Sequence, residues 1–142
     1  MLNSFWHLPW ASKILLLQTA IVLGSVYLLV YLVSFRRLSP WLGNLNQLGE
    51  SAFSPIQLQQ AQRVRWAVVR VSQSLPWHST CLVKAIAAKF LLSQRKINAT
   101  LYLGAALDPA KGLEAHAWLR CGKLFIIGEK SHRNYHALAS FS

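Results

Sequence analysis

Residues 75–92 have the sequence LPWHSTCLVKAIAAKFLL, in which a helix is predicted to follow a short polar turn. Residues 99–107, ATLYLGAAL, are β-branched and aromatic, which is typical of a strand. Residues 114–128, EAHAWLRCGKLFIIG, contain two apolar segments around Cys121-Gly122 and predict a hairpin, because glycine accepts the positive φ of a tight turn at its second position. This order predicts an α+β domain with an antiparallel sheet.

A second amphipathic helix is predicted upstream, beginning after Ser54-Pro55 and ending at Pro76. Its apolar positions recur at spacings of three and four: Ile56, Ala61, Val64, Val68 and Val71. In the following helix, Ser79 or Thr80 is the expected cap, and Asn98 lies beyond its end. The expected buried face of that helix consists of Leu82, Ile86, Phe90 and Leu91.

The N-terminal part of the chain contains a long apolar segment without charged residues. Residues 14–33 form 20 consecutive positions without a charge, between Lys13 and Arg36-Arg37. About 20 apolar residues span a bilayer as a helix, and the positive charge that follows would keep the rest of the chain cytoplasmic. The alternative is a hydrophobic helix buried against the domain. We therefore expect an apolar membrane-associated or docking helix in 1–37, a linker in 38–54 and a catalytic domain in 55–142.

The chain is strongly basic for its 142 residues, with 15 Lys and Arg against four Asp and Glu and a net charge of +11. This balance favours an anionic lipid surface or an acidic polypeptide as partner. The cations are scattered, without the basic run or aromatic-interleaved stripe of a nucleic-acid reader, so nucleic acid is not an expected partner. The two cysteines show no zinc-ligand spacing, and we expect free thiols, no metal and no cofactor.

Cys81 is the candidate nucleophile, because it lies near the start of the predicted helix. The N–H groups and the dipole there favour a negative charge, and the thiolate is the reactive form of cysteine. The alternative is a buried, inert cysteine. The candidate base is His116, 35 residues later on a predicted strand, with Trp118 on the same face to form a wall of the site. His78, three residues before Cys81, is the reserve candidate near the oxyanion.

A third group should orient the imidazole. If Cys121-Gly122 is the two-residue turn, His116 pairs with Ile127, and Glu129 is its diagonal neighbour on the same face. Glu129 is therefore the predicted third member. Glu114, two residues before His116 on the same strand, is the reserve. A one-residue change of register would turn Glu129 away.

The segments Trp77-x-Ser79-x-Cys81-Leu82 and Ala115-His116-Ala117-Trp118, in this order, resemble the lasso peptide leader peptidases. These are transglutaminase-like cysteine proteases, and the resemblance covers residues 56 to 140. It implies a papain- or transglutaminase-like fold with Cys81 as nucleophile, His116 as base and an acidic residue on the strand after the hairpin. The chain departs from the pattern there, since Glu129 stands where an Asp is usual.

The resemblance also implies a function and partners. Such peptidases remove the leader from a ribosomally made precursor peptide, a small leader-binding protein delivers the precursor, and a lasso cyclase closes the ring. Two alternatives remain open, of which only the first uses the same residues. One is an acyl transferase that passes the acyl group to an amine, and the other is a non-catalytic, membrane-tethered peptide-binding module.

Overall fold

The computed structural model describes residues 6–33, 37, 40, 53–76, 80–129 and 135–141. The described elements follow the chain in this order: α2 (Trp10–Leu32), α4 (Pro55–Ser74), α5 (Cys81–Gln94), β1 (Thr100–Asp108), β2 (Gly112–Cys121), β3 (Leu124–Ile127) and β4 (His136–Phe141). The α+β class and the N-terminal apolar helix are confirmed. The predicted linker lies outside the described residues except for Pro40, Phe53 and Ser54.

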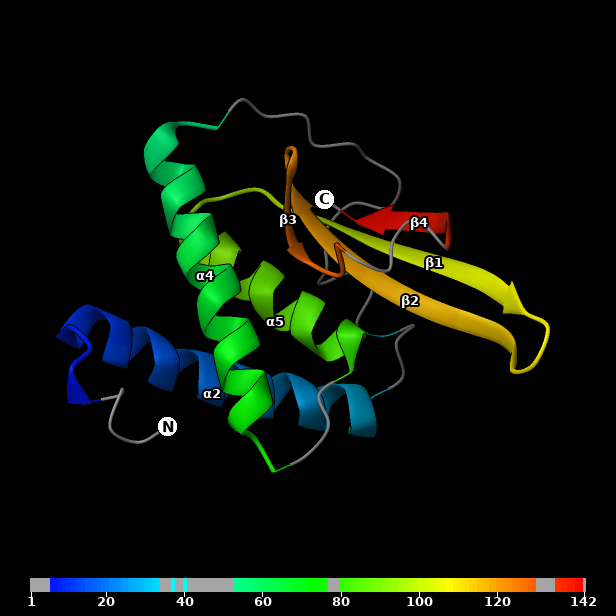
Figure 1. The fold of residues 1–142 in the computed structure, drawn as a ribbon, viewed down its shortest axis with the longest axis horizontal. Helices are drawn as coiled ribbons and strands as arrows, with labels where there is room; N and C mark the ends of the chain where they lie inside the picture. The colour runs from blue at the N-terminus through cyan, green and yellow to red at the C-terminus, as the bar shows by residue number, and fades with distance from the viewer. Residues whose placement is uncertain are drawn as a thin grey trace.

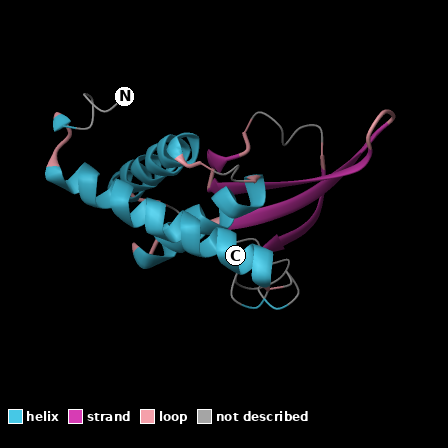
Figure 2. Ribbon diagram, turned by 90° about the horizontal axis from the view of Figure 1, so that it is seen from below, coloured by secondary structure: helices cyan, strands magenta, loops and turns pink. Residues whose placement is uncertain are grey.

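The four strands form one antiparallel sheet in the order β3-β2-β1-β4. α2 packs on α4 and α5, and these two helices pack in turn on the sheet. Figure 1 shows α4 crossing α2 and α5, with the strands on the far side of α5 from α2. Seen from below in Figure 2, α2 lies in front and the strands extend away from the helices. The sheet therefore has a helical layer on one side, and α2 is the outermost helix of that layer.

The helix starts follow from local sequence. Ser54 and Gln57 form a capping box at the start of α4, and Pro55 occupies the first turn, where its missing N–H costs nothing. Thr80 caps α5, its hydroxyl accepting from the Val83 N–H at 3.3 Å. The predicted α4 face is confirmed apart from its first position, since Ile56 is exposed.

The predicted buried face of α5 is wrong. Leu91 is buried as expected, but Phe90 is 48% exposed and Leu82 and Ile86 are only partly buried. The positions that are buried are Val83, Ala85, Ala87, Ala88, Leu91 and Leu92. The reason is that α5 lies between the other helices and the sheet, so it buries more than one face, and its alanines allow close approach on both sides.

The predicted hairpin register is also wrong. The loop residues are Gly122 and Lys123, with Cys121 paired to Leu124. Gly122 has φ of 60° and occupies the first loop position, where type II′ hairpins need a positive φ. A register shift between Leu119 and Arg120 then pairs Leu119 with Ile127. Ile127 therefore does not lie opposite His116, and β3 ends before it reaches the level of the histidine.

β4 was not anticipated. Its sequence, HALASF, contains no β-branched residue and only one aromatic residue besides histidine, so local propensity does not mark it as a strand. It forms by pairing with β1 at the sheet edge, and that pairing shifts register between Leu103 and Gly104. This strand determines where the residue before it, Tyr135, is placed.

Candidate active site

Cys81 is the first residue of α5 and has a free thiol. The first backbone N–H groups of a helix have no partner within the helix, and the helix dipole favours a negative charge beside them. The Cys81 side chain is half-buried, so it is accessible to a ligand and still sheltered on one side. This position suits a thiolate nucleophile with an oxyanion site next to it.

Cys121 is a contrasting cysteine in the same chain. It is fully buried at the end of β2, and its Sγ lies 3.6 Å from the carbonyl oxygen of Asn98. Burial raises the pKa of the Cys121 thiol, which keeps it protonated and unreactive at neutral pH. Of the two thiols, only Cys81 combines access with a helix N-terminus.

His116 lies within β2, opposite Gly104 of β1, and belongs to a row of stacked rings that crosses the sheet. Tyr102 stacks on Trp118 with ring centroids 5.7 Å apart. The centroids of the Trp118 and His116 rings are 6.1 Å apart, and those of the Tyr135 and His116 rings are 4.9 Å apart. Trp118 therefore flanks the histidine as its spacing on the strand suggested. The imidazole is held between two aromatic rings, which limits its rotation.

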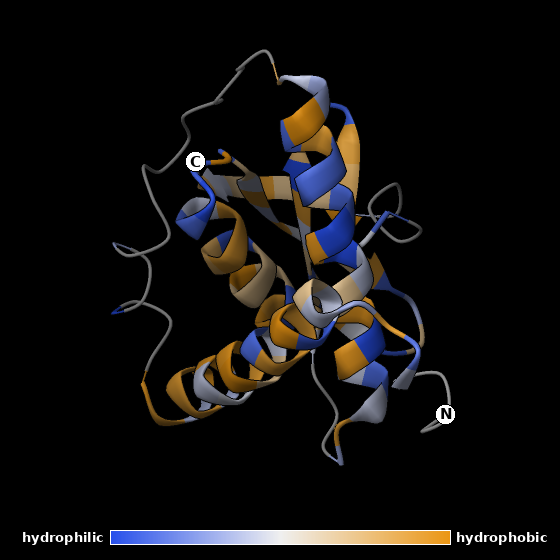
Figure 3. Ribbon diagram, turned by 90° about the vertical axis from the view of Figure 1, so that its left-hand side faces the viewer, coloured by the Kyte–Doolittle hydropathy of each residue, from blue (hydrophilic) through white to orange (hydrophobic). Residues whose placement is uncertain are grey.

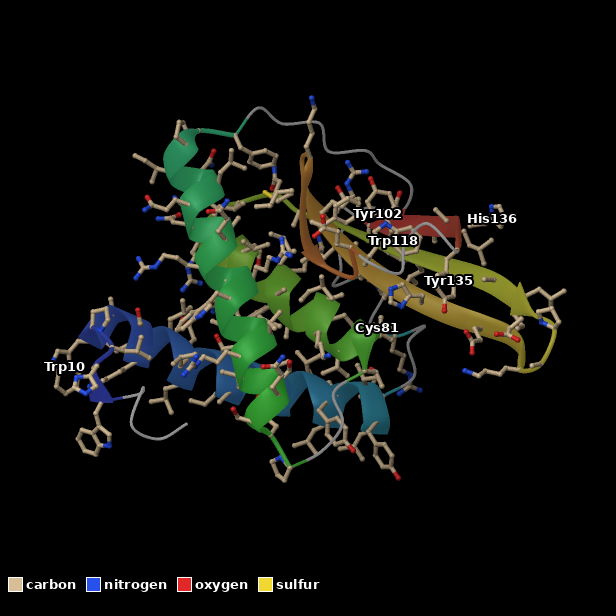
Figure 4. The ribbon with its side chains drawn as sticks, in the orientation of Figure 1. Trp10, Cys81, Tyr102, Trp118, Tyr135 and His136 are labelled. Carbon is tan, nitrogen blue, oxygen red and sulfur yellow. The ribbon has the colours of Figure 1, made fainter. Side chains whose placement is uncertain are left out.

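Tyr135 connects this row to Cys81. In the view of Figure 4, Tyr135 lies below and to the right of the Tyr102–Trp118 pair, and Cys81 lies lower still, at the start of α5. The Tyr135 hydroxyl donates to Oε2 of Glu114 at 3.2 Å. Burial and this hydrogen bond raise the pKa of the Tyr135 hydroxyl, and the charges of Glu114, Cys81 and Asp108 raise it further. Tyr135 therefore contacts the His116 ring by stacking, and Cys81 is among the groups that raise the pKa of its hydroxyl.

The His116 ring also lies against the backbone that follows β3. A Cβ atom added to Gly128 would lie 3.2 Å from Nε2 of His116 and 2.7 Å from Cβ of Trp118. Gly128 has φ of 83°, which glycine adopts without a steric cost. The absence of a side chain at Gly128 therefore makes room for the imidazole edge that carries Nε2.

Glu129 follows Gly128, but its carboxylate binds Arg65 of α4 at 3.2 Å. Both side chains are substantially exposed, so this ion pair contributes only about 0–1 kcal/mol. The register that placed Glu129 diagonally from His116 is wrong, because β3 ends at Ile127. Glu114, the reserve residue, is linked to the histidine through Tyr135, whose ring stacks on His116 and whose hydroxyl donates to the Glu114 carboxylate.

Some predicted residues cannot be located. His78 lies outside the described residues, as do Trp77 and Ser79. Tyr135 is the residue that the sequence did not single out. The only signal for it was an aromatic residue next to a histidine near the C-terminus, and its position depends on the unanticipated pairing of β4 with β1.

Comparison with known proteins identifies a superfamily for the chain. No curated protein and no solved structure matches the chain significantly. The model of the transglutaminase-like superfamily matches residues 26–140, which include Cys81, His116 and the four described strands apart from the last residue of β4. Transglutaminase-like domains are typical of cysteine peptidases and acyltransferases. On this match over most of its length, the chain belongs to the transglutaminase-like superfamily.

Proposed function

We propose that the chain is a cysteine peptidase that removes the leader from a lasso-type precursor peptide. The observation that carries this proposal is the position of Tyr135 relative to the two candidate groups. Tyr135 stacks on His116, and Cys81 contributes to the raised pKa of the Tyr135 hydroxyl, which supports the proposal that the helix start and the histidine form one site. An imidazole beside a thiol at a helix N-terminus is the arrangement that activates cysteine nucleophiles.

The proposed reaction has two steps. His116 takes the proton of the Cys81 thiol, the sulfur attacks the carbonyl carbon of the scissile peptide bond, and the C–N bond breaks as His116 returns the proton to the leaving amine. Water then hydrolyses the thioester, with His116 again as base. The N–H groups at the start of α5 would stabilise the oxyanion in both steps.

The partners of this proposal come from the resemblance. A small leader-binding protein would present the precursor, and a lasso cyclase would take the product. The catalytic domain is proposed to work in the cytoplasm, attached to the inner membrane through residues 14–33. The hydrophobic helix that contains most of these residues, Trp10–Leu32, supports the membrane part of this proposal.

Mass spectrometry of the products tests the reaction class. With a precursor peptide and its leader-binding protein, we expect a free leader whose mass includes one added water, because the thioester is hydrolysed. The matched control adds a primary amine in excess. A leader recovered mainly as the amide would identify the chain as an acyl transferase, and an uncut precursor would contradict both reactions.

The positioning of His116 gives a second prediction. We expect Tyr135→Phe, which keeps the ring but removes the donor to Glu114, to lower kcat about three- to tenfold. The loss of one hydrogen bond contributes about 0.5–1.5 kcal/mol, and KM should not change. Glu114→Gln should have a similar effect, because the amide holds the hydroxyl less strongly.

The same series decides between the two acids. Glu129→Gln is the control, since its carboxylate pairs with exposed Arg65. If Glu129 orients the histidine as the resemblance implies, Glu129→Gln will lower kcat more than Glu114→Gln. We expect the reverse order. Substitution of the acid that acts through the imidazole should also shift the acidic limb of the kcat pH profile, and substitution of the other acid should not.

A further inference from the structure

α2 has two apolar faces, of which the domain covers only one. One face is buried against α4 and α5 and consists of Ser12, Leu15, Leu16, Thr19, Val22, Leu23 and Val26. The other face carries large exposed apolar side chains: Trp10, Ile14, Leu17, Ile21, Leu28, Leu29, Tyr31 and Leu32. Figure 3 shows the helix hydrophobic along its length at the lower edge of the molecule. This second set, the outer face, forms a stripe along most of the helix.

The charged residues of the helical layer have one sign. Every charged residue of the three described helices is basic: Lys13, Arg63, Arg65, Arg70, Lys84 and Lys89. The acids among the described residues, Asp108, Glu114 and Glu129, lie in β1, in β2 and just after β3. The helical layer thus combines an apolar stripe with excess positive charge, and the acids are on the sheet side. This combination complements an anionic lipid surface.

The aromatic residues of the outer face lie near its ends. Trp10 and Tyr31 are about four-fifths exposed, at 79% and 80%. Lys13 places its ammonium 5.2 Å from the Trp10 ring and 5.8 Å from the Trp6 ring. Tryptophan and tyrosine are enriched at the level of lipid headgroups, and lysine next to them can reach the phosphates. Figure 4 places Trp10 at the opposite end of the helical layer from Cys81, so this end does not obstruct the site.

We propose that α2 lies in the plane of an anionic membrane, with its outer face in the lipid, and does not cross the bilayer. Its 23 residues have a length of about 34 Å, enough to span. However, a spanning α2 in this structure would bring the charged helices α4 and α5, which pack on its buried face, into the hydrocarbon. An in-plane helix keeps both its core contacts and its lipid contacts.

A second copy of the chain is a less suitable occupant of the outer face. Two such faces packed together would bring basic helical layers next to each other, and the Glu129–Arg65 pair offsets only part of their positive charge. An anionic bilayer neutralises the same charges. The inference depends on the fold and on the charge distribution, and it stands or falls independently of the proposed peptidase chemistry.

Flotation with lipid vesicles tests the inference on the full chain. We expect the wild type to float with phosphatidylcholine vesicles that contain phosphatidylglycerol, less with pure phosphatidylcholine, and less at high salt. Leu17→Glu, on the outer face, should lower binding at least about tenfold. Leu138→Glu is the matched control, because Leu138 of β4 is similarly exposed at 72% against 65% for Leu17, and it should bind as the wild type does.

Two further measurements separate the other outcomes. An in-plane helix should be released from the vesicles by alkaline carbonate, whereas a spanning helix is retained. Leu28→Glu, near the other end of the stripe, repeats the test if Leu17→Glu loses helicity by circular dichroism. The proposal is overturned if the wild type does not float, if both glutamate variants float like the control, if carbonate fails to release the protein, or if the outer face instead forms a dimer that Leu17→Glu dissociates.

Discussion

Cys81→Ala should abolish cleavage of the precursor peptide, with a fall in kcat/KM on the order of 10³-fold or more. The reason is that the mechanism forms a bond to the Cys81 sulfur, and no other described thiol can replace it. Cys81 is half-buried at the first position of α5, so removing its sulfur should leave the fold unchanged. The measurement is a time course of leader release with the leader-binding protein present, alongside thermal unfolding of both variants.

Cys121→Ala is the matched control. Its sulfur is fully buried, and burial raises the pKa of the thiol, so it should contribute to stability and not to catalysis. We expect a modest loss of stability, about 1 kcal/mol, of the kind that small cavities cause, and nearly full activity. Cleavage by the Cys81→Ala protein at a rate near that of the wild type would remove the chain from the cysteine peptidases and favour a peptide-binding role.

The parts of the fold that depend on local sequence were predictable. The start of α4 follows from Ser54, Pro55 and Gln57, which cap the helix among themselves, and the end follows from Pro76. The start of α5 follows from Thr80, and this places Cys81 at the helix N-terminus without any tertiary information. The candidate nucleophile could therefore be located from about five residues of sequence.

The parts that depend on contacts between distant segments were not predictable to the same degree. The hairpin register requires knowing that Gly122 takes the first loop position and that a bulge follows at Arg120, and both are set by how β2 and β3 fit the sheet. The predicted register, which placed Glu129 diagonally from His116, is wrong for this reason. Tyr135 was missed for a related reason, since it reaches His116 only because β4 pairs with β1.

Gly128 depends both on local sequence and on distant contacts. Its positive φ is a local preference of glycine, but its contact with His116 exists only in the folded sheet. Its φ of 83° admits few residues besides glycine, and an added Cβ would lie 2.7 Å from Cβ of Trp118, 3.0 Å from the Ala117 oxygen and 3.2 Å from Nε2 of His116. Neither the tryptophan Cβ nor the backbone oxygen can rotate away. The backbone at Gly128 or the segment of β2 that carries His116, Ala117 and Trp118 must therefore move.

Gly128→Ala should thus lower kcat about 100-fold, since displacing a catalytic group by about 1 Å can cost that much. Gly112→Ala provides a closely matched control: Gly112 has φ of 82°, and nothing lies within 4 Å of an added Cβ. Both variants carry the same backbone cost, about 1–2 kcal/mol, and only Gly128→Ala adds overpacking of about 1–3 kcal/mol. The free energy of unfolding and kcat, measured for both, separate the two contributions. If the two variants have equal kcat, the backbone strain that they share accounts for the whole loss of activity. The contact between Gly128 and the imidazole would then not position the base.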